Sequence, residues 1–122
     1  LLGIRPFNAG EFWDSHEAIE RVWKPLPKNL PERRFLQAII LLAAAFLHRE
    51  RARTSPERSA RPALRCANSA LRKLEGLPDS MLGIDIATLR RSAVECFAPL
   101  ESGRVPDDAL PPPVIVFQRD SA

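Results

Sequence analysis

The chain has 122 residues, of which 45% are hydrophobic, and it carries a formal net charge of +3. A chain of this length is the size of one domain and can bury a core without metal or disulfide staples, so we expect a single helical domain over residues 1–122. The small charge excess argues against nucleic-acid binding. The longest apolar run, AIILLAAAFL, is about half as long as a membrane span requires and predicts a buried core helix.

Helical periodicity dominates and predicts an all-α bundle of four main helices around a central apolar helix. The first helix is expected at about residues 9–24, with Asn8 as its N-cap and Glu11 completing a capping box. The second is expected to begin at Pro31, a favourable first helical position, and to run to about residue 51. Its apolar residues continue all round the helix, so we expect it to be the central element.

The third and fourth helices complete the predicted bundle over residues 1–109. The third is expected at about residues 56–75, where Gly76 then ends it. The fourth is expected at about residues 86–100, with Asp85 as its N-cap.

An extended tail is predicted over residues 110–122. It begins with LPPPVIVF, whose prolines favour polyproline II. We expect its apolar part to lie along a groove of this chain or of a neighbouring one.

Cys66 and Cys96 form no zinc-binding spacing. Each falls on the apolar stripe of a predicted helix, which indicates buried thiols. A reducing, cytoplasmic compartment fits this use of cysteine.

The stretch HEAIE places polar groups on the apolar stripe of the first helix. His16 lies between Phe12 and Ile19 on that stripe, Glu20 follows one turn later, and Glu17 lies beside them. Polar side chains on the core side of a helix need partners. We therefore expect a buried polar cluster at this position.

The second helix offers partners for this cluster. Gln37 and His48 are about three turns apart and share a face. Arg33 or Arg34 could reach Glu17 or Glu20 near the turn between the helices. The predicted polar cluster thus comprises His16, Glu17, Glu20, Trp23, Arg34, Gln37 and His48.

Two interpretations of the cluster stay open. A histidine and a glutamate at i and i+4 can bind one ion, so His16 and Glu20 would be ligands of a divalent metal such as zinc. Glu17 would then be the catalytic general base on a metal-bound water, and Gln37 would orient a ligand or substrate. The stretch lacks the second histidine of HExxH and the paired Glu-x-x-His of di-iron bundles. The favoured interpretation is a hydrogen-bond network that docks the first two helices.

Residues 48–65 hold six arginines against two glutamates, whereas residues 11–24 hold four acids against two bases. The chain is therefore expected to have an acidic face and a basic corner. A solvated stretch is the ordinary explanation of such a corner. The alternative is a phosphate or RNA contact, which the absence of interleaved aromatic residues disfavours. The arginines concerned are Arg49, Arg51, Arg53, Arg58 and Arg61.

The order of four stretches, FNAGEFWDSHEAIERVW, RRFLQAIILLAAAFLH, LRKLEGLP and GIDIATLR, resembles the domain of unknown function 309 family, sometimes labelled predicted metal-dependent hydrolase. The resemblance implies a compact helical bundle and brings no established activity. The chain has Leu41 where the family often has a second glutamine, and the arginine-rich stretch replaces a Gly-Asn turn and a Gly-Ala pair. The family pattern carries over at Asn8, Gly10, His16, Glu17, Glu20, Trp23, Gln37 and His48.

We therefore favour a non-enzymatic binding or structural domain that forms homo-oligomers through apolar surface and its tail. A metal-dependent hydrolase is the first alternative, and RNA or phosphate binding through residues 48–65 is a weaker one. The sequence names no substrate.

Overall fold

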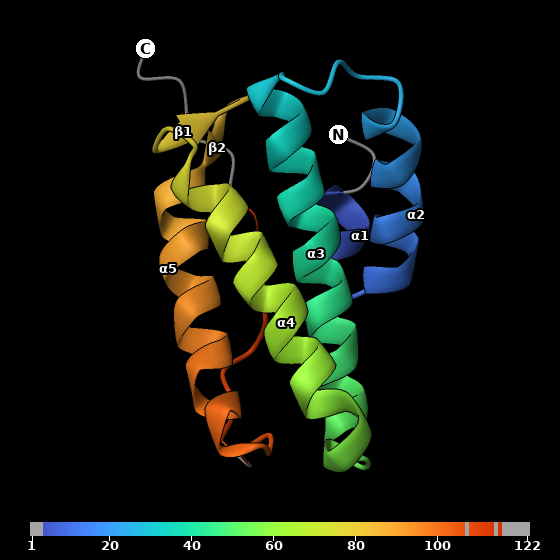
Figure 1. Cartoon of the computed structure of the whole chain (residues 1–122), viewed down its shortest axis with the longest axis vertical. Helices are drawn as coiled ribbons and strands as arrows, with labels where there is room; N and C mark the ends of the chain where they lie inside the picture. The colour runs from blue at the N-terminus through green and yellow to red at the C-terminus, as the bar shows by residue number, and fades with distance from the viewer. Residues whose placement is uncertain (1–3, 107, 114, 116–122) are drawn as a thin grey trace.

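The computed structural model describes residues 4–106, 108–113 and 115. A short hairpin of β1 (Ser80–Met81) and β2 (Ile84–Asp85) is the one sheet in this part of the chain. The predicted all-α bundle is confirmed (Figure 1). Its helices are α1 (Ile4–Asn8), α2 (Phe12–Trp23), α3 (Pro31–Ala52), α4 (Pro56–Glu75) and α5 (Ile86–Phe97), followed by the 3-10 helix η1 (Ala98–Ser102).

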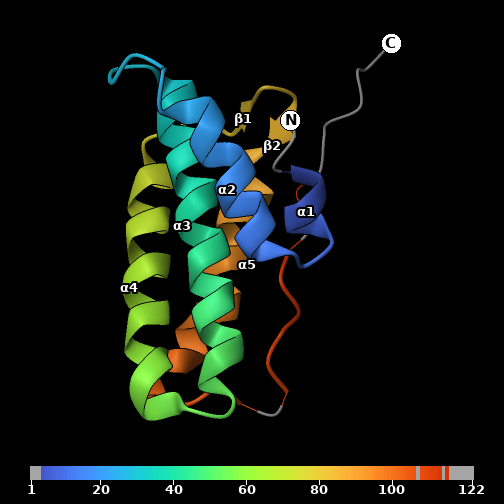
Figure 2. The ribbon, with the colours of Figure 1, turned by 90° about the vertical axis from the view of Figure 1, so that its right-hand side faces the viewer.

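Helix α3 is the central element, as predicted. It lies between α2 and α4 in both views (Figures 1 and 2) and packs most extensively against α4. Alanines on the inner face of α4, at positions 63, 67 and 70, are fully buried. Small side chains let two helices approach closely, which explains the extensive contact.

The prediction for the first helix was wrong at its start. A separate helix α1 ends at Asn8, and α2 begins only at Phe12. Between them Gly10 has φ +79°, a left-handed conformation that only glycine adopts easily. Neither Asn8 nor Glu11 caps α2 through a side-chain hydrogen bond; Glu11 holds the N-cap position without one.

Asn8 instead binds the C-terminal tail. Its Nδ2 donates to the carbonyl oxygen of Ile115 at 3.1 Å, and its Oδ1 accepts from the Ile115 backbone N–H at 2.7 Å. Ile115 is buried against the core of the same chain. At this point the tail therefore lies on its own bundle. The other apolar residues of the predicted segment, Val114, Val116 and Phe117, lie outside the described residues.

The structure around α5 differs from the prediction in two further ways. The helix predicted over residues 86–100 ends at Phe97 and continues as η1. The hairpin before α5, which the sequence did not predict, turns at Leu82 and Gly83, with φ of 53° and 75°. Two positive φ values in a two-residue loop are typical of the tight turns that join short strands.

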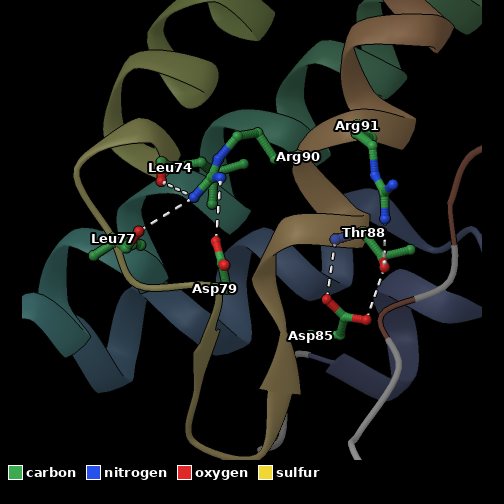
Figure 3. Close-up of polar contacts among 7 residues, drawn as sticks. All are labelled: Leu74, Leu77, Asp79, Asp85, Thr88, Arg90 and Arg91. Atoms are coloured by element: carbon green, nitrogen blue, oxygen red, sulfur yellow. Dashed lines mark hydrogen bonds and ion pairs between the residues drawn. The ribbon is translucent and has the colours of Figure 1, made fainter.

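The predicted N-cap of α5 is confirmed. Asp85 Oδ1 accepts from the Thr88 backbone N–H at 3.0 Å, and Oδ2 accepts from the Thr88 hydroxyl at 2.7 Å (Figure 3). These two hydrogen bonds lower the pKa of the Asp85 carboxyl.

Arg90 joins α5 to the end of α4. Its Nη2 donates to the carbonyl oxygens of Leu74 at 2.8 Å and Leu77 at 3.2 Å, and its Nη1 lies 3.8 Å from Asp79 (Figure 3). The Leu74 carbonyl also accepts from the Leu77 backbone N–H at 3.1 Å. Arg90 therefore adds a charged donor to the last turn of α4, where carbonyls lack helical partners, and fixes the segment leading into β1.

No described helix combines the length and the apolar character needed to cross a membrane.

Candidate functional site

Three potential ligand groups lie together on α2. His16, Glu17 and Glu20 each place one donor atom within 4.8 Å of the others. The Nδ1 atom of His16 is 3.6 Å from Glu20 Oε2, and the two side chains are 30% and 32% exposed. This proximity follows from helical spacing, because positions i, i+1 and i+4 share one side of a helix.

The cluster is on the flank of α2 and is not buried, which corrects the prediction. The inward positions of α2 are Ser15 and Ile19, which are almost fully buried. The helix register therefore turns His16 partly outward. The Nδ1 atom of the His16 imidazole is nevertheless shielded from solvent, and it has no hydrogen-bond partner among the described residues.

Lys24 competes for one member of this group. Its Nζ is 2.7 Å from Glu20 Oε1. The hydrogen bond and charge of Lys24 are the main causes that lower the pKa of Glu20, and the same pair raises the pKa of Lys24. Glu20 is therefore ionised at neutral pH and already engaged by a cation.

Trp13 extends the cluster outward, and sequence reasoning missed it. Its indole ring stacks on the His16 imidazole, with centroids 5.9 Å apart and planes at 7°. The residue is 59% exposed. The spacing of three residues between Trp13 and His16 was the available signal, since side chains at i and i+3 are neighbours on a helix.

Two other members of the predicted cluster, Trp23 and Arg34, contact residues outside it. Trp23 lies under the Arg33 guanidinium, 4.6 Å from ring centroid to guanidinium carbon. Arg34 donates to the carbonyl oxygens of Arg72 at 3.0 Å and Lys73 at 2.8 Å, at the end of α4. These hydrogen bonds tie α3 to α4 and direct the Arg34 guanidinium to the end of α4, away from the predicted partners Glu17 and Glu20.

Gln37 and His48 lie on the α4 side of α3. Gln37 Oε1 accepts from Lys73 Nζ at 3.3 Å. His48 is half-buried, and burial lowers its pKa, with smaller contributions from the charges of Arg51 and Arg65. Leu41, between them on the same face, lines a hollow together with residues of α4. The structure therefore separates these two residues from His16, Glu17 and Glu20.

The arginine-rich stretch forms the ends of two helices joined by a short turn. Because α3 extends to Ala52 and α4 begins at Pro56, only residues 53–55 lie between them. A hollow of about 530 Å³ in this region is lined partly by exposed arginines. We define the basic corner by the exposed residues Arg51, Arg53, Arg58, Arg61 and Arg65.

Arg49 does not belong to this surface, which corrects its assignment to a phosphate or RNA contact. Only 4% of the residue is exposed. Its guanidinium lies over the ring of Phe46 at 4.9 Å. The charge count of the sequence included Arg49, but its place three residues after Phe46 on an apolar helix was the signal that it turns inward.

The comparison with family models identifies one family. The model described as Domain of unknown function (DUF309) matches residues 1–59, just under half of the 122-residue chain, and the match supports the family that the sequence resembles. The matched part includes α1, α2 and α3, and with them both the α2 cluster and Arg49. No curated protein sequence matches the chain.

Proposed function

We propose that this member of the Domain of unknown function (DUF309) family is a non-enzymatic binding domain that associates with a second copy of itself through the outer face of α2. We define this outer face by Trp13, His16, Glu17 and Glu20. The observation that carries the proposal is Trp13, which is 59% exposed and whose indole stacks parallel to the His16 imidazole, with ring centroids 5.9 Å apart. A pre-ordered exposed tryptophan is typical of the anchors that dominate protein interfaces.

Charge supports the choice of partner. Residues 11–24, which include the outer face, hold four acids against two bases. Residues 48–65 hold six arginines, of which all but the buried Arg49 are exposed, against two glutamates. An acidic surface and a basic surface at different places on one chain favour a head-to-tail contact between copies. The indole of Trp13 would then enter the hollow lined by Arg58, Arg61 and Arg65 of the second copy, where guanidinium groups stack favourably on aromatic rings.

The ligand set supports a binding function over catalysis. All three donor groups come from α2, and no histidine, cysteine or acid of another described element joins them. One of them, Glu20, is already paired with Lys24. In this proposal, the acids form the charged rim around Trp13.

Replacing Trp13 with alanine should weaken self-association by about tenfold or more, because truncating an interface anchor costs roughly 2 kcal/mol. Sedimentation velocity over a concentration series measures the change. Val94→Ala is the matched control, since Val94 is also exposed, at 49%, but lies on α5. High salt should weaken the wild-type association. A wild-type chain that stays monomeric at every concentration, or a Trp13 variant that associates as tightly, would overturn the proposal.

A metal-dependent hydrolase is the second candidate, favoured by the donor atoms of His16, Glu17 and Glu20 lying within 4.8 Å of one another. His16 and Glu20 would bind a divalent ion such as zinc, and Glu17 would take the proton from a bound water.

This candidate predicts the uptake of one zinc or manganese ion per chain in calorimetric titration. His16→Ala should abolish the uptake and leave the helical circular-dichroism signal unchanged, whereas His48→Ala, on the α4 side, should leave uptake intact. The candidate fails if the wild type takes up neither ion, or if the two histidine variants behave alike.

A further inference from the structure

Arg49 is a charged residue in an apolar place. It is 4% exposed, and its guanidinium carbon lies 4.9 Å from the ring centroid of Phe46 and 6.0 Å from that of Phe97. Burial lowers the pKa of Arg49, but a guanidinium stays protonated in proteins. A buried charge normally has a partner of opposite sign, because its desolvation is otherwise very costly.

No described carboxylate is hydrogen-bonded to the free end of this guanidinium. Its Nη1 atom lacks a hydrogen-bond partner among the described residues. The adjacent acid, Glu50, is paired with Arg53, with Oε2 and Nε 3.0 Å apart. The Cys96 thiol lies within hydrogen-bonding reach of Arg49, but burial raises the pKa of that thiol and keeps it neutral. Arg49 therefore carries an N–H donor, on Nη1, that no described residue accepts from.

A cavity of about 470 Å³ adjoins Arg49. It lies between the start of α2, the last turns of α3 and the tail, which Figure 2 shows passing along this side of the bundle. Its walls are mainly apolar, from Phe12, Phe46, Pro111 and Pro112. Its lining also holds three charged residues, Arg49, Glu50 and Arg53. Both the size and the mixture of apolar walls with a few charged groups are typical of small-molecule sites.

We propose that this cavity binds a small organic monocarboxylate, whose carboxylate pairs with Arg49 and whose apolar body packs against Phe12, Phe46 and Pro111. The planar fork of a guanidinium matches the two oxygens of a carboxylate. Glu50 is neutralised by Arg53, so the charge of Arg49 leaves the lining net positive. The apolar walls favour a ligand with an aromatic or aliphatic body over inorganic phosphate. This site is independent of the association through α2.

Benzoate is a suitable probe, with benzamide as its neutral counterpart of nearly the same shape. Calorimetric titration should show benzoate binding to the wild type and no binding of benzamide or inorganic phosphate. Arg49→Met should weaken benzoate binding by about tenfold or more, the usual loss for a charge-assisted hydrogen bond. Arg91→Met, which changes an exposed arginine of α5 outside both the cavity and the basic corner, should have no effect.

Circular dichroism establishes that each variant is folded. If Arg49→Met does not fold, Arg49→Lys serves in its place, because it keeps the charge and loses the planar fork, and it should also weaken binding. Benzoate that fails to bind the wild type, that binds either Arg49 variant equally well, or that binds no better than benzamide overturns the proposal.

A carboxylate of the chain itself is the other source of the same chemistry. Asp107 precedes the tail residues that line the cavity and lies outside the described residues. Benzoate should bind the Asp107→Asn variant and the wild type equally. Binding that appears only in Asp107→Asn would show that the chain supplies its own carboxylate and would overturn the proposal of a free ligand.

Discussion

Replacing Phe46 with alanine should lower the free energy of unfolding by about 3–5 kcal/mol, the usual cost of removing a buried aromatic ring. Phe46, on α3, is 2% exposed, and its ring packs against aromatic rings of three other helices. Its ring centroid lies 6.2 Å from that of Phe7 in α1, 5.4 Å from Phe12 in α2 and 4.6 Å from Phe97 in α5. The cavity left behind would be lined by these rings, which cannot all collapse into it.

Urea denaturation followed by circular dichroism measures this loss. Val94→Ala is the control, since an exposed side chain on α5 should change stability by no more than about 0.5 kcal/mol. A loss below about 1 kcal/mol for Phe46→Ala would mean that the rings repack without it, contrary to the central position assigned to Phe46.

Replacing Arg90 with methionine should cost about 2 kcal/mol, because it removes charge-assisted hydrogen bonds to partly buried carbonyl oxygens. The acceptors are Leu74 at 2.8 Å and Leu77 at 3.2 Å, and the Arg90 side chain is 25% exposed (Figure 3). Methionine keeps most of the packing of the aliphatic stem. The change therefore tests the hydrogen bonds more than the contacts.

Arg91 offers a matched control on the same helix. It is exposed, and its bond to the Thr88 hydroxyl is 3.4 Å long (Figure 3). Arg91→Met should therefore change the unfolding free energy by less than about 0.5 kcal/mol. Equal losses in the two variants would contradict the role given to Arg90. Hydrogen exchange in residues 77–85 should also rise in the Arg90 variant alone, since Arg90 fixes the segment leading into the hairpin.

The long helices were predictable because their ends are marked in the sequence. Pro31 and Pro56 open α3 and α4, and Gly76 follows the last residue of α4. The five-residue helix α1 and the two-residue strands are too short to show a period. The role of Asn8 depends on Ile115, 107 residues away, which no local pattern reveals.

Only the part of the candidate site that a single helix forms could be predicted from the sequence. The proximity of His16, Glu17 and Glu20 follows from helical spacing alone. Gln37 was expected beside them and lies by Lys73 of α4. Helix α3 is apolar nearly all round, so its pattern does not say which face meets α2 and which meets α4.

The most direct test of the proposed self-association is sedimentation velocity on two charge-swapped variants, alone and mixed. Glu17→Arg places a positive charge on the acidic outer face of α2 and leaves the basic corner unchanged. The double variant Arg58→Glu, Arg61→Glu replaces two positive charges of the basic corner with negative ones and leaves the outer face of α2 unchanged. A head-to-tail contact predicts that each variant alone is monomeric and that the mixture forms one-to-one dimers, since each then supplies the surface that the other lacks. A mixture that stays monomeric under conditions in which the wild type associates would contradict the proposed surfaces.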